Sequence, residues 1–304
     1  MEMPAEDQHA QLDIHIDAFR NDEVEAVAEL ARACAARADE ALGNWEWTEG
    51  PELERELARW PVPATETLFV AREAGKVIGF CGVECYPGSE IGLVHGPVVE
   101  SSARGRGVGR ALFSVALRNG ERNGAAELWA VTGRDNRRGQ ALLAEAGFVR
   151  GEACALFRLE RAAHTPLVVP EDVRRATSED LPEVLALAEA LGDDLHMSLD
   201  EIASALVDPT WHVWISGIPN ALSIVCIDPD DRWVRALATH EDARRRGLGA
   251  TVLSAALSGW WSDHPDATLG LSVRADSLAV LTQYHRLGFE PRLVVTRHTR
   301  LANT

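Results

Sequence analysis

"DARRRGLGATVL", residues 242–253, places three arginines and two glycines directly before an aliphatic run. A closely similar stretch, "SARGRGVGRALF", occupies residues 102–113. The surroundings repeat as well. In both halves a strand-like run precedes the motif, an apolar run with helical spacing follows it, and a Gly-Phe pair comes about 40 residues later. Because two features recur at matched spacing, the sequence predicts an internal duplication.

The length of 304 residues suits two domains of ordinary size. We expect a first domain over 1–160, a linker over 161–172 and a second domain over 173–304. The linker holds two prolines and has little periodicity. Strand-like and helix-like runs are interleaved in both halves, which predicts a mixed α/β class, with α+β character, for each domain.

Composition excludes several classes of protein. The net charge is −17, and acidic residues outnumber basic ones in both halves, so nucleic-acid binding is not expected. An acidic surface attracts cationic substrates, or it simply keeps the protein in solution. The five cysteines have no spacing that suits zinc, so we expect no metal and free thiols in a reducing cytoplasm. The acidic N-terminus does not resemble a signal peptide, and no apolar run suits a membrane span.

The glycines of the motif predict a phosphate-binding loop. Glycine lets the backbone approach a ligand closely, and the N-terminus of the following helix offers unpaired N–H groups. A Walker loop requires lysine, and the only lysine, Lys76, lies elsewhere. A dinucleotide-binding fingerprint requires a third glycine where this chain has Arg110 and Val252.

The pattern that fits is Arg-x-x-Gly-x-Gly, and it resembles the pyrophosphate loop of the GCN5-related N-acetyltransferases. "ATHEDARRRGLGATVLSAAL" (238–257) resembles the central motif of that family, and "VLTQYHRLGF" (280–289) resembles its ending. The resemblance covers almost the whole chain. It implies two tandem domains, each a mixed, mostly antiparallel sheet flanked by helices. It also implies acetyl-CoA as co-substrate and a small-molecule amine as acceptor.

The resemblance also implies which half performs the chemistry. The family binds the acetyl carbonyl with a backbone N–H seven residues before the motif arginine. That residue is Leu237 in the second half, whereas the first half has Pro97, which has no N–H. The family's acid is a tyrosine, here Tyr284, where the first half has Leu143. The nearest carboxylate for a base is Asp231, although an ordinary solvated turn residue is the competing interpretation.

Residues for acetyl-CoA binding follow from the same resemblance. In the second half they are Leu237, Thr239, Arg244, Arg245, Arg246, Gly247, Leu248, Gly249, Ala250 and Ser277. In the first half they are Arg104, Gly105, Gly107, Gly109 and Asn136. The first half is expected to be degenerate or accessory, either binding acetyl-CoA without turnover or supporting the second half. His95 lies on the corresponding strand, but in the half without the tyrosine.

We therefore expect an acetyl-CoA-dependent N-acetyltransferase that acetylates a small-molecule amine by direct transfer in the C-terminal domain. The alternative is a catalytically weak acyl-CoA-binding protein with a sensing or scaffolding role. The identity of the amine, the general base and the choice between monomer and homodimer stay open at this point.

Overall fold

The computed structural model describes residues 14–37, 45–86, 90–191, 197–217, 222–275 and 278–302. The chain forms two compact units. Unit 1 comprises Met1–Ala153 with Val294–Thr304, and unit 2 comprises Cys154–Leu293. The last strand of each sequence half thus contributes most of its length to the other unit. A sequence interpretation that keeps each half together cannot anticipate this exchange.

Unit 1 contains a mixed sheet with strand order β1-β2-β3-β4-β5-β12. Only β4 and β5 pair in parallel, and the other neighbouring strands are antiparallel. Its strands are β1 (Ile14–Ala18), β2 (Leu68–Glu73), β3 (Lys76–Cys85), β4 (Ile91–Val99), β5 (Glu127–Gly133) and the end of β12 (Glu290–Leu301). Its helices are α1 (Val24–Ala35), α2 (Gly50–Ala58), α3 (Ala64–Thr67), α4 (Val108–Arg122) and α5 (Arg137–Glu145).

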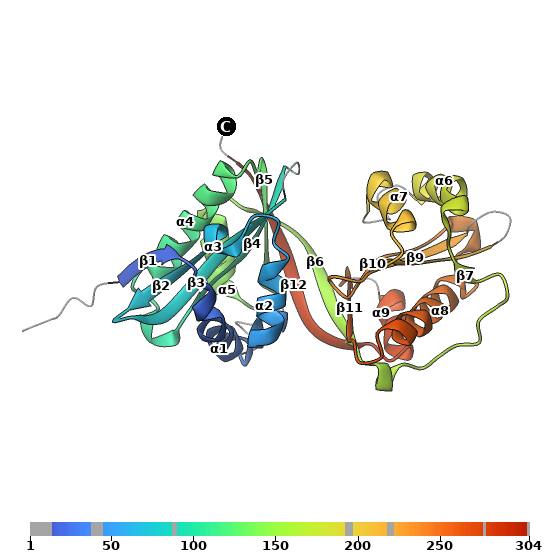
Figure 1. The fold of residues 1–304 in the computed structure, drawn as a ribbon, viewed down its shortest axis with the longest axis horizontal. Coiled ribbons are helices and arrows are strands. Elements are labelled where there is room, and N and C mark those ends of the chain that lie inside the picture. The colour runs from blue at the N-terminus through green and yellow to red at the C-terminus, as the bar shows by residue number, and fades with distance from the viewer. Residues whose placement is uncertain are drawn as a thin grey trace, which may run out of the picture. The chain divides into compact units, whose positions relative to one another are not determined.

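Helices lie on both faces of this sheet (Figure 1). Two clusters of apolar side chains pack between the sheet and these helices. On one face, α4 packs the side chains of Leu112, Phe113 and Ala116 against the strands. This is the helix that the apolar spacing after the first motif predicts. On the other face, α1 and α2 pack against β2 and β3 around Leu53 and Phe80. Because both faces are covered, every residue of β3 after Lys76 is buried.

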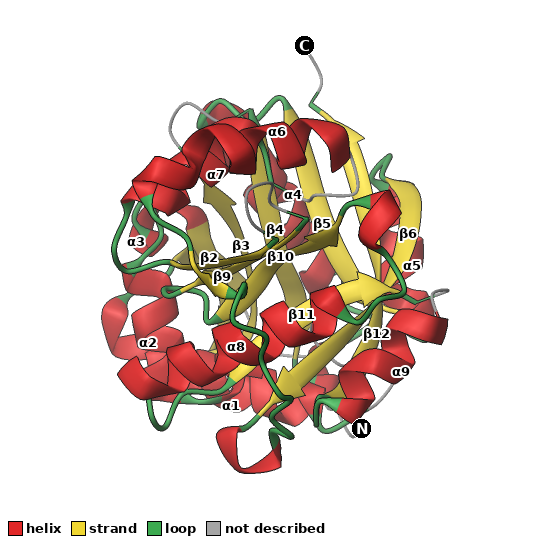
Figure 2. Cartoon of the chain, turned by 90° about the vertical axis from the view of Figure 1, so that its right-hand side faces the viewer, coloured by secondary structure: helices red, strands yellow, loops and turns green. Residues whose placement is uncertain are grey.

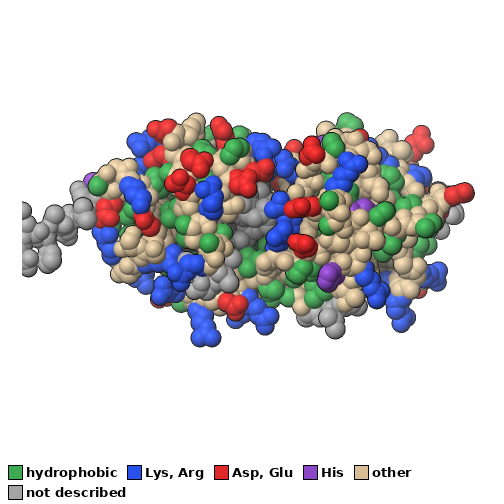
Figure 3. Space-filling model, turned by 90° about the horizontal axis from the view of Figure 1, so that it is seen from below, with side chains coloured by type: hydrophobic (Ala, Val, Ile, Leu, Met, Phe, Trp, Pro, Cys, Tyr) green, Lys and Arg blue, Asp and Glu red, His purple; other side chains and the backbone are tan. Residues whose placement is uncertain are grey.

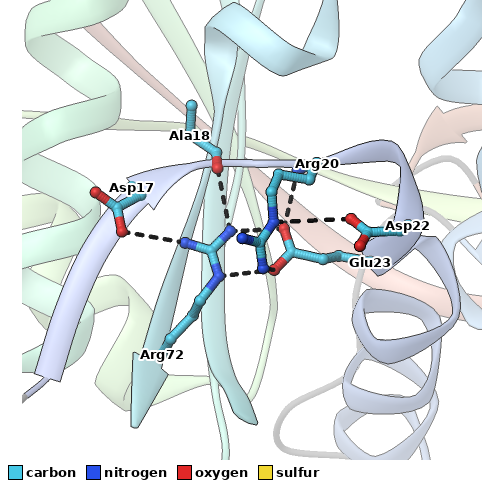
Figure 4. A network of polar contacts seen from close by, with 6 residues as sticks. All are labelled: Asp17, Ala18, Arg20, Asp22, Glu23 and Arg72. Atoms are coloured by element: carbon cyan, nitrogen blue, oxygen red, sulfur yellow. Dashed lines mark hydrogen bonds and ion pairs between the residues drawn. The ribbon is translucent and has the colours of Figure 1, made fainter. Parts of the chain in front are cut away.

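A polar network fixes the start of α1 to the edge of this sheet (Figure 4). The guanidinium of Arg72, on β2, donates two hydrogen bonds to the carboxylate of Glu23, each 2.7 Å long. It also donates to the carbonyl oxygen of Ala18 at 3.2 Å and pairs with Asp17 at 3.3 Å. Glu23 and Arg72 are 6% and 8% exposed, so the pair is largely shielded from water.

The strands of unit 2 pair in the order β6-β11-β10-β9-β8-β7. Again only one pair, β10 with β11, is parallel. Its strands are β6 (Val149–Leu159), which joins from Cys154 onward, β7 (Arg174–Arg175), β8 (His212–Ser216), β9 (Ser223–Asp228), β10 (Trp233–Thr239) and β11 (Leu269–Arg274). Its helices are α6 (Leu181–Leu191), α7 (Leu199–Val207), α8 (Leu248–Asp263) and α9 (Leu278–Arg286).

Helices lie on both faces of the unit 2 strands (Figure 2). α6 and α7 pack on one face around Val184, Leu187 and Ile202. α8 lies on the other face, and its buried side chains include Val252 and Leu257, as the apolar spacing after the second motif predicts. The architecture confirms the predicted α/β class with mixed, mostly antiparallel sheets.

The surface of the chain is charged with both signs. Acidic and basic side chains are interspersed over the face that Figure 3 shows. Within the described part of the chain, no helix combines the length and apolar character that crossing a bilayer requires. The same residues contain no group of three or more metal-ligating side chains.

Candidate functional site

The glycine loop has the same backbone in both units. Gly107 and Gly247 immediately precede α4 and α8 and have φ angles of 82° and 81°. Neither helix start is capped by a side chain, so the first N–H groups of each helix are not used by a cap. A Cβ added to either glycine would meet nothing within 4 Å. Each loop therefore leaves the first backbone N–H groups of its helix accessible at the positive end of the helix dipole. Such groups can bind the negatively charged oxygens of a pyrophosphate.

The second motif glycine serves a different purpose. A Cβ at Gly249 would lie 3.0 Å from Thr239 Oγ1, and one at Gly109 would lie 3.4 Å from Val99 Cγ2. A side chain at Gly249 would require Thr239 or the first turn of α8 to shift by a few tenths of an ångström, whereas a Cβ at Gly109 would make an ordinary van der Waals contact. Thr239 Oγ1 is held in turn by a 2.8 Å hydrogen bond with Ser223 Oγ.

The first arginine of the motif ties the loop to the strand. Arg244 Nε donates to the carbonyl oxygen of Thr239 at 3.0 Å, and Arg104 Nε donates to that of Val99 at 2.9 Å. The sequence assigns both arginines to cofactor binding. In the structure their Nε atoms bond to the backbone, which fixes the shape of the loop.

The remaining arginines differ between the two units. In unit 1, Arg106 pairs with Glu73 at 2.6 Å and Arg110 pairs with Glu145. In unit 2, Arg245 and Arg246 are exposed and make no ion pair with any residue that the structure describes. Unit 2 therefore presents two uncompensated positive charges beside its loop, whereas unit 1 has carboxylates beside its own.

The parallel strands part next to each loop. β4 and β5 pair only from Ile91 to Val94, although both strands continue beyond that point. β10 and β11 pair only at Trp233 and Val234. A bulge accompanies each parting: the β3–β4 register shifts between Phe80 and Gly82, and the β9–β10 register shifts between Val234 and Ala236. A bulge changes the direction of the strand and leaves some of its backbone groups without a partner. We call the place where the two parallel strands separate the opening of each unit.

The backbone N–H of Leu237 faces the opening of unit 2. The N–H of His240 donates to Leu222 at 2.8 Å, on the β9 side. N–H directions alternate along an antiparallel strand, so Ala238 also faces β9, whereas Leu237 and Thr239 face away from it, towards the parting from β11. The same alternation in unit 1 turns Pro97 towards the opening, and proline has no N–H to offer.

Tyr284 and its counterpart Leu143 are both buried. The Tyr284 ring is 6% exposed and packs against Phe157 and Phe289, with ring centroids 6.0 and 5.6 Å apart. Burial raises the pKa of its phenol to about 12. Leu143 is 2% exposed and belongs to the core under α4. The phenol therefore stays protonated at any pH at which the enzyme would be assayed.

The structure does not bring Asp231 together with Leu237. Asp231 lies in the turn between β9 and β10, where it pairs with Arg235 at 3.6 Å. Leu237 follows Asp231 by six positions, and the four steps from Trp233 to Leu237 along β10 alone span about 13 Å. Its position matches that of a solvated turn residue, the competing interpretation.

The remaining predicted residues have various positions. Asn136 caps α5 by accepting a 2.8 Å hydrogen bond from the N–H of Gly139. Gly105 and Arg245 both have left-handed backbone, with φ of 77° and 64°. Leu248 and Ala250 lie in the first turn of α8, next to the loop. Ser277 lies outside the described residues.

One polar pair near the opening of unit 1 escaped the sequence analysis. Glu84 on β3 and His95 on β4 form a hydrogen bond, and His95 directly follows the last residue of β4 that pairs with β5. The motif had drawn attention to the strand of His95, but no sequence signal pointed to Glu84.

Comparison with known proteins agrees with this geometry. Residues 25–148 match the model of the acetyltransferase (GNAT) family. A mycothiol acetyltransferase of Gordonia bronchialis is 28% identical over 236 residues, which span 69% of this chain and 74% of that protein. A mycothiol acetyltransferase of Streptomyces coelicolor is 28% identical over 107 residues, 35% of this chain and 34% of that protein.

Solved structures show the same fold. A GCN5-related N-acetyltransferase from Sphaerobacter thermophilus aligns over 95% of both chains with a TM-score of 0.73 and 16% identity. A tandem GNAT protein from the clavulanic acid biosynthesis pathway aligns over 96% of this chain and 99% of its own, with a TM-score of 0.61 and 17% identity. The family model matches the first half of the chain, and the solved structures show that the chain as a whole has the tandem GNAT fold.

Proposed function

We propose that the chain is an acetyl-CoA-dependent N-acetyltransferase that acetylates a small-molecule amine, and that transfer takes place in unit 2. The observation that carries the proposal is the Leu237 N–H, which faces the parting of β10 and β11 beside the Gly247 loop. This arrangement brings an oxyanion donor and a pyrophosphate cradle to one end of one strand.

Each group has a defined task in the reaction. The loop N–H groups and the charges of Arg245 and Arg246 hold the pyrophosphate of the co-substrate. The neutral amine attacks the thioester carbonyl, and the Leu237 N–H stabilises the oxyanion that forms. The carbon–sulfur bond then breaks, and Tyr284 assists departure of the thiolate. Because Asp231 lies far along the strand, the proton of the amine passes to water rather than to that carboxylate.

Two further features support a small amine as acceptor and a cytoplasmic location. The net charge of −17 attracts an alkylammonium ion from solution. A curated relative is named mycothiol acetyltransferase, and this name makes a small molecule the first class of acceptor to test. All five cysteines are free, as is usual in a reducing cytoplasm.

Substitution of Leu237 tests the proposal directly. Leu237→Pro removes the N–H without touching a bond to β9, and Leu237→Ala keeps the N–H and removes only the side chain. We expect kcat to fall about 10²- to 10³-fold in Leu237→Pro and to change only a few-fold in Leu237→Ala. Acetyl-CoA should still raise the melting temperature of both variants. Equal rates in the two variants would place the transfer outside unit 2.

A second candidate is a catalytically weak acyl-CoA-binding protein with a sensing or scaffolding role. Two observations favour it: the Tyr284 phenol is buried with a raised pKa, and Asp231 is remote from the opening. A thiol-release assay with a panel of amines distinguishes the candidates. A melting shift with acetyl-CoA but no release of CoA with any amine would support the binding protein.

A further inference from the structure

Two hydroxyl groups form a hydrogen-bonded pair beside the opening of unit 2. Ser223, on β9, and Thr239, on β10, are partners in the strand register, and their hydroxyl oxygens lie 2.8 Å apart. Ser223 is fully buried, and its hydroxyl donates to the carbonyl oxygen of Ala238 at 3.0 Å. A serine hydroxyl has only one hydrogen, so Thr239 donates to Ser223 rather than accepting from it. The hydrogen bonds therefore run in one direction, from Thr239 through Ser223 to the Ala238 carbonyl.

This hydroxyl pair acts on the peptide group that joins Ala238 to Thr239. The peptide is trans and planar, so its N–H points away from its carbonyl oxygen. The oxygen faces β9, and the N–H of Thr239 therefore faces the opening, where β11 no longer pairs with β10. His240 donates to Leu222 across β9 and β10, which makes Ala238 and Ile224 a hydrogen-bonded pair as well. The Ala238 oxygen then accepts two bonds, which polarise the peptide and strengthen its N–H as a donor.

The other polar groups of Thr239 are used within unit 2. Its carbonyl oxygen accepts from Arg244 Nε at 3.0 Å, and its hydroxyl donates to Ser223. The first turn of α8 lies close over this hydroxyl, since a Cβ on Gly249 would come within 3.0 Å of it. The residue is thus fixed from three sides, and its N–H is the group that is directed at the opening.

Unit 1 has a different pair of residues at the matching positions. They are Gly79 and Val99, which are register partners of β3 and β4 and carry no hydroxyl. A Cβ on Gly79 would lie 3.0 Å both from the carbonyl oxygen of Val98 and from Cδ1 of Leu112, so a serine would be crowded there. The hydroxyl pair therefore distinguishes unit 2, in which we propose that transfer takes place, from its duplicate.

We propose that Ser223 is a positioning residue for the acyl donor of unit 2, and that it acts by directing and strengthening the Thr239 N–H. The inference rests on the proposed use of acetyl-CoA, in which an arm containing amide groups joins the pyrophosphate to the thioester. Leu237 precedes Thr239 in the chain and the Gly247 loop follows it, so an arm that reaches from the loop to Leu237 passes this N–H. An amide carbonyl of the arm is the group that it binds. Two residues of strand place the N–H groups of Leu237 and Thr239 about 7 Å apart, so the acetyl carbonyl and the arm have separate donors.

Ser223→Ala removes the hydroxyl that acts on the peptide. We expect the dissociation constant of acetyl-CoA to rise about three- to tenfold, as measured by isothermal titration calorimetry. ADP carries a pyrophosphate without the arm, so its dissociation constant should not change, because the bond between Arg244 and Thr239 that shapes the loop stays in place. A merely structural role of Ser223 would loosen the loop and weaken both ligands alike. Any binding in unit 1 should be unchanged.

Ser254→Ala is the matched control. Ser254 is also a fully buried serine of unit 2, and its hydroxyl accepts from the N–H of Leu167 at 2.9 Å, on α8 rather than at the opening. Its loss should lower the melting temperature, as the loss of Ser223 does, and leave the dissociation constant of acetyl-CoA unchanged.

Variants of Thr239 test the direction of the hydrogen bonds. Thr239→Val removes the donor to Ser223 and should weaken acetyl-CoA binding by less than Ser223→Ala does, whereas Thr239→Ser keeps the donor and should bind as the wild type does. In the Ser223→Ala background, Thr239→Val should add little, because the two hydroxyls act as one unit.

The outcomes separate this inference from the proposed function. An unchanged dissociation constant of acetyl-CoA in folded Ser223→Ala, or an equal loss for ADP, overturns the inference. If Ser223→Ala does not fold, the comparison of Thr239→Val with Thr239→Ser replaces it, and equal constants for acetyl-CoA in these two variants overturn the inference. A wild type that binds acetyl-CoA but transfers acetyl to no amine contradicts the proposed function, while the dissociation constants still decide the role of Ser223. A wild type that does not bind acetyl-CoA contradicts both.

Discussion

Arg244 Nε donates to the carbonyl oxygen of Thr239, 3.0 Å away, and this bond ties the glycine loop of unit 2 to the end of β10. The duplicate in unit 1 makes the same bond between Arg104 and Val99 at 2.9 Å. Since two loops with different neighbours make the same bond, the first arginine of the motif acts chiefly on the shape of the loop. Under the proposed function, the charges that attract the pyrophosphate would then come from Arg245 and Arg246.

Substituting the arginines one at a time separates these roles. Arg244→Gln removes the tie and a charge, whereas Arg246→Gln removes a charge alone. A charge-assisted hydrogen bond at an exposed site contributes about 1 kcal/mol, so Arg244→Gln should weaken acetyl-CoA binding about fivefold more than Arg246→Gln. Isothermal titration calorimetry measures both dissociation constants. Equal losses would mean that Arg244 contributes only charge.

Two residues of the loop have left-handed backbone, and we expect substitutions at them to change the stability of the protein in opposite directions. Gly247 has φ of 81°, so Gly247→Ala should destabilise the protein by about 1–2 kcal/mol. Arg245 has φ of 64° and carries a side chain in that region, so Arg245→Gly should relieve strain and raise the melting temperature slightly. Thermal unfolding of the two variants beside the wild type checks the prediction. A lower melting temperature for Arg245→Gly would show that its side chain makes a stabilising contact.

Local sequence predicted the parts of the site that are themselves local. The loop and the helix that follows it lie within a short stretch of sequence, so the spacing of glycines and apolar residues was enough to predict them. The same holds for the difference between Leu237 and Pro97, which are the matching positions of the two repeats. Asp231 shows the limit of this reasoning. It is close to Leu237 along the chain, but an extended strand rises about 3.3 Å per residue and carries it away.

Features that depend on pairing between distant segments could not be predicted. Glu84 and His95 meet only because the β3–β4 register, with its bulge, places them on one face. Glu23 and Arg72 are 49 residues apart and meet where α1 begins beside β2. The exchange of last strands between the units leaves no mark in the residues themselves, since a strand has the same alternation in either sheet.

The Glu23–Arg72 pair predicts how stability depends on pH. Burial on its own raises the pKa of Glu23, but hydrogen bonds and the charge of Arg72 outweigh it, so the pKa in the folded protein lies below the usual value of 4.5. As the pH falls, Glu23 is therefore protonated at a higher pH in the unfolded chain than in the folded protein. The stabilisation is fully present above about pH 5 and is lost as pH falls through the folded value.

Glu23→Gln tests that dependence. It leaves the Arg72 guanidinium buried without its main partner, which should cost about 3 kcal/mol at pH 7. The difference in melting temperature between wild type and variant should shrink as the pH is lowered from 7 to 3. Glu52→Gln, which breaks an exposed pair with Arg55, is the matched control and should have a small effect at both pH values. A constant difference across the pH range would contradict the prediction.

Tyr284 is the last test, because burial weakens the case for a strong acid. With a pKa of about 12, the phenol is protonated throughout the assay range, but proton transfer to a thiolate whose conjugate acid has a pKa near 8.5 is uphill by about 5 kcal/mol. Tyr284→Phe should therefore lower kcat by about tenfold at most and leave acetyl-CoA binding intact.

The pH–rate profile of the wild type should have no alkaline decline from this group up to about pH 10. The ring keeps its contacts with Phe157 and Phe289, so the melting temperature should change little. A loss of kcat beyond about 10²-fold would mean that the phenol is a required proton donor and that its pKa falls when the thioester binds.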